Sequence, residues 1–186
     1  MRFNTGIYYL PEQGRSSITS AISAEAVAMH KYISRGTDVC GYYSGQTFAA
    51  QINLTSRPAN SLEIVSNYAG GKYREITLGD SKIVLRKPKQ QINNENWKSL
   101  QFLDFIKDID LYADYKNDIC REIIRTYIWQ NHITKDMIDQ YISSYPDKIY
   151  RIIYEMELPT AFYTSLDSFE SEVFITSPNR PALQKR

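Results

Sequence analysis

The chain has 186 residues, of which 42% are apolar and 23% charged, and its formal net charge is +1. These ordinary values exclude wholesale disorder, and the small net charge argues against a protein that coats a polyanion over its whole surface. Cys40 and Cys120 are far apart and form no CxxC pair or Cys/His cluster, so neither a disulfide framework nor a zinc site is indicated. The chain shows no signal-peptide pattern and no apolar run of membrane-spanning length, which predicts a cytoplasmic protein without metal or cofactor.

The first predicted elements are a strand and a helix. Residues 3–10 favour a short strand that ends at Pro11. After a polar stretch, Ser23 is the expected N-cap of a helix whose apolar face would include Met29 and Ile33. Gly36 is expected to end this helix.

The middle of the chain predicts one helix followed by strands. Residues 41–45 indicate a turn or a short strand, and residues 46–52 a short helix capped by Ser44 or Thr47. Gly79-Asp80 is the order expected in a type II′ hairpin turn. The strands around it are predicted to form a three-stranded antiparallel meander over residues 62–87, with strands at 62–67, 73–78 and 82–85.

The second half of the chain has helical periodicity. Leu100, Leu103 and Ile106 share one helical face, behind Asn93 as the expected N-cap. Residues 116–130 repeat the spacing, and Thr134 and Asp147 are expected to cap two further helices. Beyond residue 157 the periodicity fades.

These elements together predict an α+β fold in which a small helical bundle packs on a mixed, strand-rich first half. The expected parts are a strand at residues 1–11, a domain over 12–157 and a partly ordered tail over 158–186 with an extended segment at 172–176. Within the domain, residues 12–90 are strand-rich and residues 91–157 helical. The seam near residues 88–94 is short, so both halves are expected to belong to one domain.

A basic hairpin is the clearest candidate binding site. Its six cations outnumber Glu75 and Asp80, and a basic ribbon can follow a nucleic-acid backbone because each neutralised phosphate releases counterions. Lys82 and Arg86 are predicted on one face of their strand. The simpler interpretation is the solvated outer face of a sheet. The candidate residues are Lys72, Arg74, Lys82, Arg86, Lys87 and Lys89.

The helical half carries an excess of acids that either serve solubility or meet a basic partner. They are Asp104, Asp108, Asp110, Asp114, Asp118 and Glu122.

Catalytic signals are weak. Asp80-Ser81-Lys82, with Glu63 or Glu75 as a second carboxylate, has the outline of a metal-dependent nuclease site, but an aspartate at a turn tip usually has a conformational role. His30 and His132 complete no catalytic triad, and residues 41–45 lack the features of a phosphate-binding loop. A nuclease therefore remains only a remote alternative, and no catalytic residue is assigned.

A longer pattern resembles a known family. Gly6-Ile7-Tyr8-Tyr9-Leu10-Pro11 is similar to the exit from the wing of a winged helix-turn-helix in AbiEi-type antitoxins, and the sequence after it resembles the second domain of that family. The similarity extends over about residues 4–110. Its further strings are Tyr32-Ile33-Ser34-Arg35-Gly36, Gly41-Tyr42-Tyr43-Ser44-Gly45 with Ala49, Asn53-Leu54-Thr55-Ser56-Arg57-Pro58, Glu63-Ile64-Val65-Ser66-Asn67, Arg74, Val84-Leu85-Arg86-Lys87-Pro88, the run from Ile92 to Asn96, and Leu100-Gln101-Phe102-Leu103-Asp104.

This resemblance implies an antitoxin and transcriptional autoregulator of a type IV toxin–antitoxin, or abortive-infection, module that serves in phage defence. Its partner would be a nucleotidyltransferase-like toxin. In the family a winged helix binds the promoter DNA and the second domain mediates antitoxicity. Residues 1–11 match only the last strand of the wing, so neutralisation of the toxin is the stronger expectation and DNA binding through the basic hairpin is the alternative.

Overall fold

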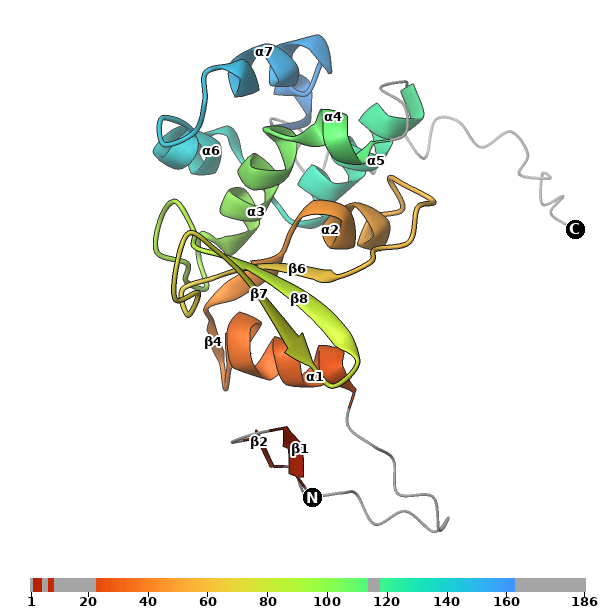
Figure 1. Ribbon diagram of the computed structural model, residues 1–186. Helices are drawn as coiled ribbons and strands as arrows, with labels where there is room; N and C mark the ends of the chain where they lie inside the picture. The colour runs from red at the N-terminus through yellow and green to blue at the C-terminus, as the bar shows by residue number, and fades with distance from the viewer. Residues whose placement is uncertain (1, 5–6, 9–22, 114–117, 163–186) are drawn as a thin grey trace, which may run out of the picture.

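A four-stranded mixed sheet forms the middle layer of the protein (Figure 1). The structure is a computed structural model that describes residues 2–4, 7–8, 23–113 and 118–162. In spatial order the strands are β5 (Gly41–Tyr43), β6 (Leu62–Ser66), β8 (Ser81–Arg86) and β7 (Tyr73–Leu78).

The predicted meander over residues 62–87 is wrong in its strand order. β8 lies between β6 and β7, pairing parallel with β6 and antiparallel with β7. The physical reason lies in burial. Ile83, Val84 and Leu85 are all buried, so β8 is covered on both faces as a central strand must be. β7 is largely exposed and polar, which suits an edge strand.

The hairpin turn between β7 and β8 is confirmed. Gly79 has a φ of 58°, and Asp80 is not among the residues with positive φ, as a type II′ turn requires.

One face of the sheet is covered by α1 (Ala24–Ala28) and a π-helix, Met29–Ile33, that continues it. Ser23 caps α1 as predicted, because its Oγ accepts the Ala26 N–H at 3.1 Å. The predicted apolar face is wrong in part: Val27, Ala28 and Tyr32 are buried, and Met29 is exposed. The residues packed in this layer are Val27, Ala28, Tyr32, Ile64, Ala69, Leu78, Ile83 and Leu85.

The predicted helix end at Gly36 is also wrong. The π-helix ends at Ile33, and Gly36, with a φ of 61°, lies in the turn of a two-stranded hairpin. Its strands are β3 (Ser34–Arg35) and β4 (Asp38–Val39).

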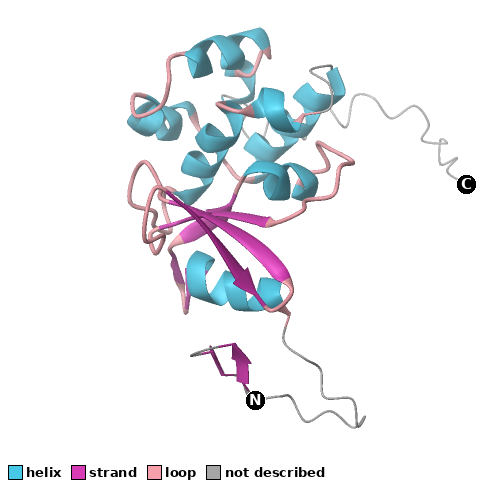
Figure 2. Cartoon of the chain, in the orientation of Figure 1, coloured by secondary structure: helices cyan, strands magenta, loops and turns pink. Residues whose placement is uncertain are grey.

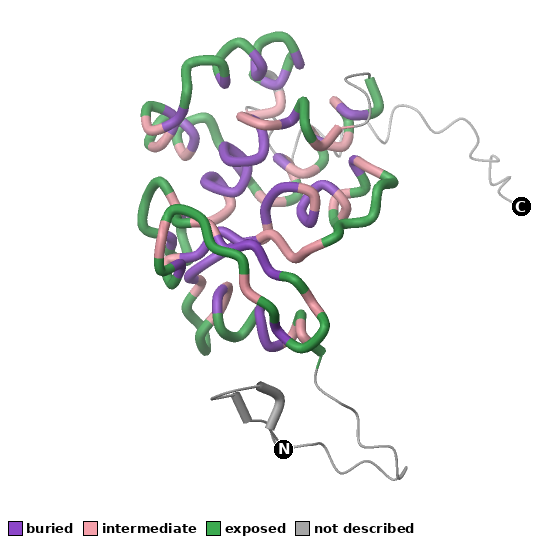
Figure 3. Tube along the Cα trace, viewed as in Figure 1, coloured by how far each residue is buried: buried purple, intermediate pink, exposed green. Residues whose placement is uncertain are grey.

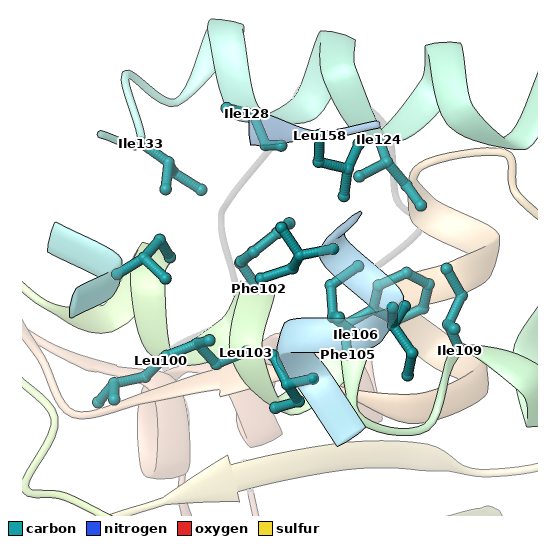
Figure 4. Close-up of a cluster of buried hydrophobic side chains, with 14 of the residues drawn as sticks. Leu100, Phe102, Leu103, Phe105, Ile106, Ile109, Ile124, Ile128, Ile133 and Leu158 are labelled. Atoms are coloured by element: carbon teal, nitrogen blue, oxygen red, sulfur yellow. The ribbon is translucent and has the colours of Figure 1, made fainter. Parts of the chain in front are cut away.

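The other face of the sheet carries α2 (Gly45–Gln51), α3 (Trp97–Ile106) and the rest of the helical half (Figure 2). The burial colouring shows α3 as the most enclosed helix (Figure 3), with every residue from Ser99 to Ile106 buried. Phe102, Phe105 and Ile106 cluster with Ile124 and Ile128 of the next long helix (Figure 4). This core joins the two halves, which confirms the α+β class and the helical second half.

Four helices and one 3-10 helix follow α3 in the described part of the chain. Thr134 caps α6 as predicted, accepting the Met137 N–H at 3.3 Å, but Asp147 makes no side-chain cap for α7. Asn93 does not cap α3; its Oδ1 accepts the Glu95 and Asn96 N–H groups in a turn before it. The elements are α4 (Ile109–Tyr112), α5 (Asp118–Gln130), α6 (Lys135–Ile142), α7 (Lys148–Glu155) and the 3-10 helix η2 (Pro159–Phe162).

Three helices end in the same left-handed motif. Asn53, His132 and Glu157 have φ values of 58°, 53° and 53°. In each case the next residue is a buried Leu or Ile whose N–H bonds back to a carbonyl of the last helical turn, for example Ile133 to Ile128 at 3.0 Å. This is the Schellman arrangement, and it gives His132 a structural role.

The ends of the chain differ from the sequence prediction. In place of one strand over 3–10, β1 (Arg2–Asn4) pairs antiparallel with β2 (Ile7–Tyr8). The ordered domain continues past residue 157, because Leu158 is fully buried and η2 packs Phe162 against Phe102. The predicted extended segment at 172–176 lies outside the described residues. Among the described helices, none has both the length and the apolarity to cross a bilayer.

Candidate functional site

Glu63 joins the sheet to the start of α2. Its Oε1 accepts the Gln46 N–H at 3.0 Å, and its Oε2 accepts a hydrogen bond from the Arg86 guanidinium at 2.9 Å. Gly45 makes room for this carboxylate: its φ is 56°, and a Cβ there would lie 2.2 Å from Glu63 Oε2. Ser44, one of the two caps expected from the sequence, occupies the N-cap position without making the capping bond. Glu63, on strand β6, therefore accepts an N–H group at the start of α2, the role that the sequence predicts for the hydroxyl of Ser44 or Thr47.

The six basic candidate residues do not form one continuous surface. Lys82 and Arg86 lie on one face of β8, as predicted, and both are paired: Lys82 with Glu75 at 2.7 Å and Arg86 with Glu63. Arg74 is opposite Leu85 and so lies on the other face of the sheet. Within the described part of the chain Lys72, Lys87 and Lys89 make no ion pair. The hairpin therefore offers fewer free charges to a phosphate backbone than the sequence suggests.

Part of this charge surrounds a cavity of about 60 Å³ that we call the β8–α3 cavity. It opens where the end of β8, the residue before α2 and the last turn of α3 meet. The sequence does not predict that Ser44, Lys107 and Tyr112 line this cavity, because they belong to segments far from the hairpin in sequence. The cavity is lined by Ser44, Gly45, Val65, Arg86, Lys87, Lys89, Asp104, Lys107 and Tyr112.

Asp104 is buried at the wall of this cavity. The Tyr42 hydroxyl donates to its Oδ2 at 2.5 Å, and the Lys107 ammonium donates to its Oδ1 at 2.5 Å. Burial, and then the charge of Asp104, raise the pKa of Tyr42 well above its ordinary value. Asp104 is thus an internal link between β5 and α3, and the prediction that it serves solubility or meets a basic partner is wrong.

Three buried or partly buried tyrosines predict the behaviour of the protein in alkali. Desolvation raises the pKa of Tyr43 to about 12, from an ordinary value of 10.0, and also raises the pKa values of Tyr127 and Tyr145. The unfolded chain loses these protons first, so their stabilising contribution is complete below pH 10 and is lost as the pH rises through the folded-state values. We expect the tyrosinate absorbance to rise in two phases, the second coinciding with loss of circular dichroism.

One variant tests this assignment. Tyr127→Phe should reduce the late phase, because it removes a tyrosine whose pKa is raised by burial. A single phase near pH 10 from a protein that keeps its native circular dichroism would contradict the prediction.

The remaining acids of the helical half are mostly paired. Asp108 lies 3.6 Å from Lys148, Asp118 lies 3.3 Å from Arg121, and Glu122 lies 3.0 Å from Arg125. Asp114 is outside the described residues. Each of these three acids therefore has its own basic neighbour, so they do not form one continuous acidic surface.

The nuclease pattern finds no geometric support. Asp80 lies in the hairpin turn, and Glu63 and Glu75 are engaged by Arg86 and Lys82. Across the residues that the structure describes, no three His, Cys, Asp or Glu side chains are grouped so that they could hold a metal ion.

No protein-family model, curated protein or solved structure matches the chain.

Proposed function

We propose that this chain is the antitoxin-type component of a type IV toxin–antitoxin, or abortive-infection, module. In this proposal it counteracts a nucleotidyltransferase-like toxin by binding and has no enzymatic activity of its own. A cytoplasmic location belongs to the proposal and suits the buried thiol of Cys40, which forms no disulfide bond.

The observation that carries the proposal is the internal role of the residues in the family-like pattern. Asn67 exchanges two hydrogen bonds with the backbone of Ile92, at 2.8 and 2.9 Å. Asn94 accepts the Val39 N–H at 2.6 Å and donates to the Thr37 carbonyl at 3.1 Å. These contacts hold loops to one another. Residues of the family-like pattern therefore hold the fold together. We infer that the protein acts through the surface that this fold presents.

The helical half presents a surface suited to a protein partner. A groove of about 630 Å³ lies between the end of α2 and α5. Ile119, Ile123 and Tyr127 line it together with Asp118 and Glu122, and Ile119 is 69% exposed. Exposed apolar side chains flanked by charged groups are typical of protein interaction sites.

Neutralisation of the toxin is the direct test. The proposal requires a nucleotidyltransferase-like toxin gene beside this one; that toxin is expressed from one inducible promoter and this chain from another. We expect the chain to restore growth, measured as colony counts under toxin induction. Undiminished toxicity in cells that contain the folded chain would refute the proposal.

Two glycine variants test whether protection requires the folded chain or only its expression. Gly41→Ala should abolish protection, because a Cβ there would meet backbone atoms at 2.2 and 2.7 Å. Gly71→Ala, where a Cβ meets nothing within 4 Å, should protect as well as the parent chain.

A further inference from the structure

Cationic residues outnumber acidic ones in the lining of the β8–α3 cavity. Four cationic side chains line it against one carboxylate, that of Asp104. Both Asp104 oxygens are engaged, one by Tyr42 and one by Lys107. The four cations are Arg86, Lys87, Lys89 and Lys107.

The acids around the cavity do not cancel this charge. Glu63 pairs with Arg86, and Asp108 lies 3.8 Å from the Lys107 ammonium. Lys87 and Lys89 have no acidic partner in the described part of the chain. These two lysines, beside Arg86 in the lining, leave an excess of positive charge that favours an anion.

Ser44 gives independent support for a ligand. Ser44 is one of the lining residues, only 5% of it is exposed, and its Oγ makes no hydrogen bond within the described structure. A buried hydroxyl without a partner is costly, and one on a residue that lines a cavity can be completed by a ligand. An acceptor oxygen in the cavity would satisfy this donor.

We propose that the β8–α3 cavity binds one phosphate group of a small molecule, either inorganic phosphate or a phosphate monoester. The volume of about 60 Å³ corresponds to about two water molecules, which suits a tetrahedral oxyanion and leaves the rest of a monoester outside. Arg86 and Lys107 supply charge from within, Lys87 and Lys89 supply it at the edge, and Ser44 donates a hydrogen bond. The proposal does not depend on the antitoxin assignment.

The test is a titration of the full chain with inorganic phosphate at constant ionic strength, followed by amide chemical shifts and calorimetry, with chloride as reference. We expect saturable binding that shifts the amides of residues 44–46 and of Arg86, Lys87 and Lys89. Ser44→Ala should weaken it about tenfold, as expected for the loss of a hydrogen bond to a charged acceptor. Without ligand this variant should be no less stable than the parent chain, because the hydroxyl has no partner to lose.

Ser99→Ala is the matched control. The Ser99 Oγ is also buried without a hydrogen-bond partner, but it lies outside the cavity lining. We expect it to leave phosphate affinity unchanged. Equal weakening by both serine variants, or no weakening by Ser44→Ala, would overturn the proposal.

Charge is tested separately. Lys87→Gln combined with Lys89→Gln should weaken phosphate binding at least tenfold, whereas Lys72→Gln, at an exposed lysine outside the cavity, should change it less than twofold. Both variants alter exposed lysines that make no ion pair with any residue the structure describes, so both should fold.

Three probes separate the possible sources of the phosphate. Binding of inorganic phosphate or of adenosine monophosphate supports the proposal, and their relative affinity shows whether a monoester is preferred. Binding only of an oligonucleotide without terminal phosphates would overturn it in favour of backbone recognition. The same shifts with chloride would also overturn it.

Discussion

Replacing Gly41 with alanine is expected to lower the free energy of unfolding by about 3 kcal/mol or more, because the new methyl group has no room to move. Its Cβ would lie 2.2 Å from the Tyr32 carbonyl oxygen and 2.7 Å from that of Val65. Both are backbone atoms, one at the end of the π-helix and one on β6. Relief would require the π-helix and the sheet to separate.

The Tyr32 carbonyl oxygen already has two close neighbours. The Ser66 hydroxyl donates to Tyr32 O at 2.6 Å, and the Cys40 thiol lies 3.6 Å from it. Displacing Tyr32 would therefore also break a fully buried hydrogen bond.

Urea unfolding followed by circular dichroism measures the Gly41 effect, with Gly71→Ala as the control. We expect Gly71→Ala to stay within about 1 kcal/mol of the parent protein, since it lies in open space and has no positive φ. An unfolding midpoint of Gly41→Ala equal to that of the control would contradict the close approach of β5 to the π-helix.

The second large effect is expected from Asp104→Ala, at about 3 to 5 kcal/mol of lost stability, the usual consequence of removing one member of a buried ion pair. The Tyr42 hydroxyl, on a residue that is only 2% exposed, would lose its carboxylate acceptor. Lys107, whose side chain is 22% exposed, would lose its close partner.

Two comparisons make this prediction specific. Asp108→Ala removes a carboxylate whose lysine neighbours lie at 3.6 and 3.8 Å, and we expect a cost of less than about 1 kcal/mol. In a Tyr42→Phe background, Asp104→Ala should cost clearly less than in the parent chain, because the hydroxyl is no longer left unpaired. Equal costs in both backgrounds would mean that the Tyr42–Asp104 bond contributes nothing.

Some features that depend on a few consecutive residues were predicted correctly, although the caps expected at Asn93 and Asp147 and the helix end at Gly36 were not. The caps at Ser23 and Thr134 and the Gly79-Asp80 turn follow from side chains that bond to backbone groups within three residues, or from the backbone freedom of glycine. The α3 face that contains Leu100, Leu103 and Ile106 follows from helical periodicity, and all three residues are buried.

Features that join distant segments were not predicted. The order of β6, β7 and β8 depends on which strand reaches the protected centre of the sheet, and pairing of consecutive strands was the simpler expectation. The run Ile83-Val84-Leu85 was the available signal, because three consecutive apolar residues favour a strand covered on both faces. Asp104 gave no such signal, since an aspartate among acids does not show in sequence that a tyrosine 62 positions away will bury it.

The sequence by itself determined an α+β domain with a helical second half, because composition and periodicity are carried by the order of residues along the chain. Tertiary structure decided which charges remain available. It paired Lys82 and Arg86 with glutamates and turned Asp104 inward. It also brought Ser44 and Lys107 beside Lys87 and Lys89 around one cavity. Electrostatic interactions act through space, so the sign and strength of a site depend on neighbours that only the folded chain brings together.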